Sequence, residues 1–96
     1  MRLERVTRIA SRVRRTIEVL ARREGTDPRS LNGWCARASV SLFRNLRDAG
    51  FHASIYAHFL RRPDIVSHFH NTVILDGKRY IVDITATQFG PDWFKR

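Results

Sequence analysis

The sequence has little of what disulfide-rich, secreted or membrane proteins are made of. Its single cysteine excludes a disulfide within the chain, and a reducing compartment suits a lone thiol best. It has no run of about 18 apolar residues, so we expect no membrane-spanning helix. The amino terminus is charged and lacks the apolar stretch of a secretory signal. We therefore expect the protein to be cytoplasmic in the cell that makes it.

Acidic residues are also scarce. The chain has 18 Lys and Arg against 9 Asp and Glu, a formal net charge of +9 at pH 7. Such a charge attracts nucleic acid, anionic lipid or an acidic protein, and does not by itself select one of them. Because no helix-turn-helix or aromatic-studded sheet motif is present, we expect an acidic protein partner rather than nucleic acid.

The length of 96 residues predicts one small domain. No internal repeat or low-complexity segment divides the chain. We expect residues 1–96 to form a single domain that has two parts. These are an Arg-rich amphipathic helix within residues 1–25 and a compact core over residues 31–94.

The amino-terminal segment predicts a helix over residues 3–24. Apolar residues recur three and four positions apart, which puts them on one helical face: Leu3, Val6, Ala10, Val13, Ile17 and Leu20. Gly25 and the following Thr-Asp-Pro stop the helix. The pattern fits a helix that covers a small core. It also fits a helix that binds a partner or a second copy, or one that lies on nucleic acid or a membrane surface.

The second part predicts one helix followed by strands, an α+β fold. The helix runs through Cys35 to Ala49, with Asn32 as its N-cap and Gly50 as its stop. Three strands follow, over residues 51–59, 69–75 and 79–84, and we expect them to form an antiparallel sheet that packs on this helix. In the first strand the apolar residues alternate and predict one buried face: Phe51, Ala53, Ile55, Ala57 and Phe59.

The dipeptide Asp76-Gly77 is a strong hairpin signal between the last two strands. If these are the two loop residues, Leu75 pairs with Lys78, and His70 lies directly opposite Asp83 on the same face. Moving the loop to residues 77–78 keeps both side chains on one face. A three-residue loop would put them on opposite faces.

Cys35, His70 and Asp83 together suggest thiol chemistry. A carboxylate fixes the tautomer of a histidine and stabilises its imidazolium, and such a histidine can take the proton of a nucleophile. The start of a helix favours the thiolate form of a cysteine and offers N–H donors for an oxyanion. We therefore predict a nucleophile, a base and an orienting carboxylate in that chain order.

The residues that carry this chemistry resemble a known superfamily. The stretches Gly33-Trp34-Cys35, His70 to Gly77, Tyr80 to Thr85 and Gln88-Phe89 look like the papain/transglutaminase-like cysteine enzymes, closest to small bacterial papain-fold toxins and deamidase effectors. The resemblance covers about residues 31–90. It implies a minimal papain-like catalytic core in which Cys35, His70 and Asp83 form a catalytic triad.

The same resemblance implies the activity and the partners. We expect a cysteine hydrolase or acyltransferase that acts on protein amides, first a glutamine deamidase and second a papain-like protease. Its substrate is then a protein with a reactive glutamine or peptide bond, and an acidic inhibitor or immunity protein is a further partner. A toxin or effector would be delivered into a target cell. No cofactor or metal is implied. The supporting positions are Asn32, Trp34 and Gln88.

Three interpretations other than a catalytic triad stay open. The alternative to catalysis is that Cys35 is a small buried apolar residue and His70 a packed strand histidine. His68 and His70, with Cys35, His58 or Asp83, have the residue types of a zinc site. The chain could also be a non-catalytic basic module that binds a partner or nucleic acid.

Overall fold

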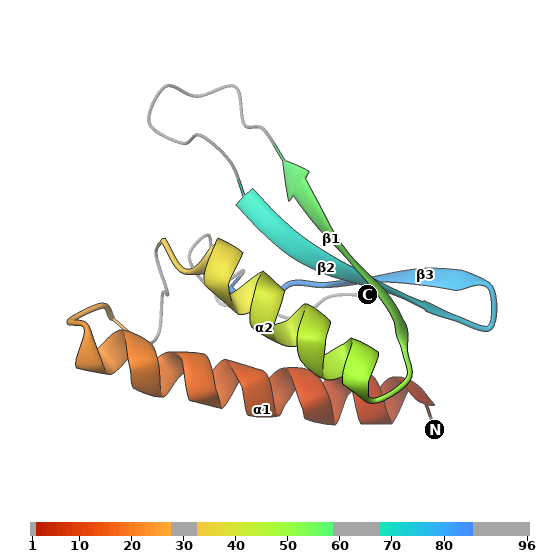
Figure 1. The fold of residues 1–96 in the computed structure, drawn as a ribbon, viewed down its shortest axis with the longest axis horizontal. Coiled ribbons are helices and arrows are strands. Elements are labelled where there is room, and N and C mark those ends of the chain that lie inside the picture. The colour runs from red at the N-terminus through yellow and green to blue at the C-terminus, as the bar shows by residue number, and fades with distance from the viewer. Residues whose placement is uncertain (1, 28–32, 59–67, 86–96) are drawn as a thin grey trace.

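The computed structural model describes residues 2–27, 33–58 and 68–85 of the protein (Figure 1). It contains two helices and three strands, in the order α1 (Arg2–Arg23), α2 (Cys35–Asp48), β1 (His52–His58), β2 (His68–Leu75) and β3 (Lys78–Val82). Helix α2 lies between α1 and the sheet, and it contacts α1, β1 and β2 (Figure 1). The predicted α+β class with a three-stranded antiparallel sheet is confirmed.

Helix α1 buries its apolar stripe, as predicted, and its ends agree with the prediction to one residue. The helix ends at a left-handed glycine, Gly25, with φ of 81°. One buried position is not apolar, because the stripe includes Arg14. The buried residues of α1 are Val6, Ile9, Ala10, Val13, Arg14, Ile17 and Ala21.

Helix α2 begins later than the sequence suggested. Its N-cap is Trp34, which makes no side-chain capping hydrogen bond, so the prediction of Asn32 as the N-cap is wrong. Gly33 has φ of 80°, a left-handed conformation that cannot continue into a right-handed helix, and the helix therefore starts after it. Asn32 itself lies outside the described residues. The predicted stop at Gly50 is confirmed, with φ of 90°.

The sheet has the order β1-β2-β3, and both pairs are antiparallel. Asp76 and Gly77 form the predicted two-residue loop, and Leu75 pairs with Lys78. The φ angles of the two loop residues are 51° and 79°, both positive, as a type I′ turn requires. The predicted register of the hairpin is therefore confirmed.

The alternation predicted for the first strand is only partly correct. Phe51 and Ala53 are buried, whereas Ile55 is 36% exposed. Toward its carboxyl end β1 diverges from α2 (Figure 1). Phe59 lies outside the described residues.

A single apolar core joins both helices to the sheet. Its largest fully buried apolar side chains are Val6 of α1, Leu42 and Leu46 of α2, and Val73 and Val82 of the sheet. The first helix is thus a structural layer of the domain rather than an appendage. Side chains on the core-facing side of α1 are buried, and those on its opposite side are exposed.

Candidate functional site

Cys35 is the first residue of α2, and its side chain is half-buried. By helical position it shares the inward face of α2 with Ser39 and Leu42, which are buried. The first N–H groups of a helix have no partner within the helix, and the side chain of the N-cap residue Trp34 makes no capping hydrogen bond to them. The backbone around Cys35 therefore offers donors for an oxyanion, as predicted for a nucleophile at a helix start.

Trp34, the residue before the cysteine, anchors the start of α2 to the end of α1. The indole is buried, and its Nε1 donates to Thr26 Oγ1 at 3.2 Å. The guanidinium of Arg37 lies 3.9 Å from the centre of the indole ring and also pairs with the Glu24 carboxylate at 2.9 Å. Trp34 thus fixes the position of the cysteine-bearing turn by packing.

His70 is the third residue of β2, and Asp83 directly follows the last residue of β3. The β2–β3 ladder runs to the pair Asn71–Val82, and the next position along the confirmed register sets His70 against Asp83. His70 is buried, at 6% exposed, and its ring stacks on the cross-strand ring of Tyr56 with centroids 5.9 Å apart and planes at 14°. The pairing of the imidazole with the carboxylate therefore stays a prediction, one position beyond the observed ladder.

The carboxylate of Asp83 organises the turn that follows β3. Its Oδ1 accepts from the backbone N–H of Thr85 at 3.2 Å and from the Thr85 hydroxyl at 3.3 Å. Helix α1 holds the same turn, because the buried guanidinium of Arg14 donates to the carbonyl of Ile84. Arg14 also pairs with Glu18 at 3.0 Å. Sequence reasoning missed Arg14, although it is the one arginine on the apolar stripe of the first helix.

Asn71 is the second residue that sequence reasoning missed. It is 1% exposed, and its Nδ2 donates to the carbonyl of Ser39 in α2 at 2.9 Å. This bond ties β2 to the helix one turn beyond Cys35. It also shows that Asn71 is on the face of β2 that packs on α2.

Side chains alternate along a strand, so His70 lies on the face of β2 turned away from α2. The structure thus places His70 on one side of the sheet and Cys35, in α2, on the other. Among the described residues, no hydrogen bond joins Cys35 to His70. Gln88 and Asn32, the other two predicted supporting residues, lie outside the described residues.

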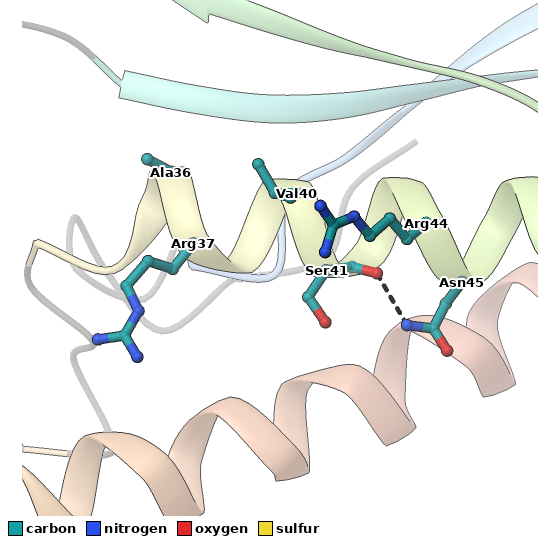
Figure 2. Close-up of a pocket in the computed structure, with 6 residues that line it drawn as sticks. All are labelled: Ala36, Arg37, Val40, Ser41, Arg44 and Asn45. Carbon is teal, nitrogen blue, oxygen red and sulfur yellow. Dashed lines mark hydrogen bonds between the residues drawn. The ribbon is translucent and has the colours of Figure 1, made fainter.

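A groove of about 460 Å³ runs along the outer face of α2 (Figure 2). It combines two arginines with small polar and apolar side chains: Ala36, Arg37, Val40, Ser41, Arg44 and Asn45. These residues are on the side of the helix opposite to Ser39 and Leu42. The groove is therefore separate from Cys35, His70 and Asp83.

The side chains of the described segments show no metal site. Within residues 2–27, 33–58 and 68–85, no group of three or more His, Cys, Asp or Glu gathers where it could hold a metal ion. In the same part of the chain, every buried side-chain nitrogen or oxygen has a hydrogen-bond partner. The buried polar residues of the candidate site are thus held in place by the fold.

The chain matches no family model, no curated protein and no solved structure. Neither of the two described helices is long and apolar enough to cross a membrane. Since no comparison matches, only the residues of the chain itself indicate its function.

Proposed function

We propose that the protein catalyses thiol-dependent acyl transfer on protein amides, and that deamidation of a glutamine is its reaction. Cys35 is the nucleophile, His70 the base and Asp83 the carboxylate that orients the base. The observation that carries the proposal is the hairpin register, which runs to the pair Asn71–Val82 in a sheet that packs on the cysteine-bearing helix. Continued by one position, this register sets His70 against Asp83. The resemblance to papain/transglutaminase-like enzymes names the same three residues.

Two buried hydrogen bonds support the proposal, because one joins the strand of His70 to the helix of Cys35 and the other holds the turn next to Asp83. Asn71 ties β2 to α2 through the Ser39 carbonyl. Arg14 ties the turn after β3 to α1 through the Ile84 carbonyl, one residue from Asp83. A catalytic site needs its groups on well-positioned elements, and these bonds hold β2 from Asn71 onward and the turn after β3, while the residues before Asn71 are left to change conformation.

In the proposed reaction, His70 takes the proton of the Cys35 thiol and the sulfur attacks the carboxamide carbon of the substrate. The backbone N–H groups at the start of α2 stabilise the oxyanion. The C–N bond then breaks, the imidazolium gives its proton to the leaving nitrogen, and ammonia departs from a thioester. Water, deprotonated by His70, attacks the thioester and releases a carboxylate and the thiol.

This reaction sets a requirement on β2. Because Asn71 faces α2, His70 faces away from it. The imidazole therefore has to move from the far face of the sheet, past the amino-terminal end of β2, to reach the Cys35 thiol. His70 is only three residues into the strand, where a local change costs few ladder bonds. The proposal therefore includes a conformation in which the first residues of β2 turn toward α2.

A specific observation favours a second function, that of a non-catalytic basic module. The outward face of α1 carries a row of exposed arginines, of which only Arg5 contacts the described core, over the Phe51 ring. In this case Cys35 is a partly buried structural residue, and Asp83 serves to form the turn with Thr85.

The experiment is to incubate the protein with a peptide digest of a bacterial extract and to find glutamines converted to glutamate by mass spectrometry. We expect conversion by the wild type, none by Cys35→Ser, and a loss of at least about a hundredfold for His70→Ala, the usual contribution of a general base. His52→Ala is the matched control, since His52 is an exposed histidine of β1. Conversion that survives Cys35→Ser, or no conversion by the wild type, overturns the proposal.

A further inference from the structure

The exposed face of α1 carries a straight row of arginines. At spacings of three, four and three lie Arg5, Arg8, Arg12 and Arg15, and after the exposed Val19 the row ends in Arg22. All of these side chains are exposed, and they lie opposite the stripe that α1 buries. The row extends about 26 Å along the helix. We call these five arginines the α1 arginine row.

The α1 arginine row is available to a partner because α1 is the outermost layer of the domain (Figure 1). Two of the glutamates near the row are used elsewhere, since Glu18 pairs with Arg14 and Glu24 pairs with Arg37. Within the described segments, Arg8 and Arg12 form no ion pair. Folding the domain therefore leaves most of the positive charge of this row unmatched.

We propose that the α1 arginine row is a docking surface for an acidic helical segment of a partner protein. The spacing of the arginines is that of one face of a helix, so a second helix with glutamates or aspartates at the same spacing meets them one to one. Each contact is then a charge-assisted, potentially bidentate hydrogen bond between a guanidinium and a carboxylate. This inference does not depend on the proposed catalysis.

Val19 favours a protein over nucleic acid as the occupant. It is 46% exposed and occupies one position within the row, between Arg15 and Arg22. A partner helix can cover this apolar side chain, whereas a phosphate backbone gains nothing from it. The phosphates of a duplex also follow a curved path, so a straight row meets few of them. A membrane is disfavoured because the apolar face of α1 is already buried in the core.

The test uses the full chain and a synthetic helical peptide whose glutamates are spaced three and four apart. A peptide of the same composition with its glutamates distributed round the helix is the comparison. Binding is measured by fluorescence anisotropy at low and at physiological salt, alongside a short DNA duplex and phosphatidylserine vesicles. We expect the peptide with the glutamate row to bind more tightly than the other three probes.

The matched variants are Arg8→Gln/Arg12→Gln in the row and Arg44→Gln/Arg47→Gln on the exposed face of α2. Both remove two charges, and glutamine forms helices as well as arginine does. We expect the row variant to weaken peptide binding about fivefold and the α2 variant to leave it within about twofold, at typical strengths for exposed ion pairs. Equal losses in both variants, equal binding of the two peptides, or tighter binding of the duplex or the vesicles overturns the proposal.

Discussion

The buried amide of Asn71 gives the sharpest test of how the cysteine-bearing helix is joined to the sheet. Asn71 is 1% exposed, and its Nδ2 donates to the Ser39 carbonyl at 2.9 Å. In Asn71→Asp the new side chain has the same size but, when ionised, only acceptor atoms. A carboxylate then faces a carbonyl oxygen in a buried site, and both repulsion and desolvation raise the pKa of the new carboxyl group.

The expected cost of Asn71→Asp depends on pH. Near pH 7 the variant loses the hydrogen bond and buries a poorly paired charge, about 3 kcal/mol of unfolding free energy together. Near pH 4 the protonated carboxyl can donate to the Ser39 carbonyl, and the loss falls to about 1 kcal/mol or less. A carboxyl with a higher pKa in the folded chain holds its proton more strongly there, so the stability of the variant falls as the pH rises above about 3.9.

The assay is urea denaturation of the wild type and Asn71→Asp at both pH values, with each variant compared with the wild type at the same pH. A domain of this length has about 5 to 14 kcal/mol of stability, so a loss of 3 kcal/mol is easily measured. Asn71→Ala is the control, because it removes the bond without adding a charge and its cost should not change with pH. An Asn71→Asp variant that is equally destabilised at both pH values, or as stable as the wild type at pH 7, would refute the reasoning.

Three further predictions concern other buried or constrained groups. Arg14→Lys keeps the charge but loses the planar guanidinium that joins Glu18 to the Ile84 carbonyl. We expect urea denaturation to show an unfolding free energy lower by about 1 to 3 kcal/mol. A decrease below about 0.5 kcal/mol contradicts this role. Gly77→Ala should lower the unfolding free energy by about 1 kcal/mol, since φ there is 79°, whereas Gly77→Asn should cost clearly less; equal costs would contradict the left-handed turn. Trp34→Phe keeps an aromatic ring but removes the donor to Thr26. A thermal scan should show a melting temperature lower by about 4 to 8 °C, the shift that about 1 kcal/mol produces in a domain of this size. An unchanged melting temperature would show that the hydrogen bond does not stabilise the fold.

The helices and the hairpin could be predicted from the sequence because local rules determine them. The three-and-four spacing of apolar residues gave α1, and the glycines after each helix gave both stops. The Asp76-Gly77 dipeptide gave the loop and with it the whole register of β2 and β3. The placement of His70 against Asp83 followed from that register alone.

The relation between the sheet faces and α2 could not be predicted in the same way. Alternation shows that His70 and Asn71 lie on opposite faces, but both are buried, so hydrophobicity does not say which of them faces the helix. The exposed fraction of Ile55 is likewise a tertiary property, which alternation along the strand does not determine. Asn32 failed as a cap because the left-handed Gly33 lies between it and the helix.

The central claim is that Cys35 and His70 form an activated pair. Its most direct test is the rate of alkylation of Cys35 by iodoacetamide as a function of pH, in the wild type, His70→Ala and the control His52→Ala. Because Cys35 is the only cysteine, the rate reports on it alone. An ordinary cysteine has a pKa of about 8.5 and is protonated well below that pH. We predict that Cys35 of the wild type is alkylated fast at such pH values. His70→Ala should lose this fast alkylation, and His52→Ala should keep it. A thiol that reacts only near that ordinary value and is indifferent to His70 would contradict the account, and the basic docking module would then be the better description of the protein.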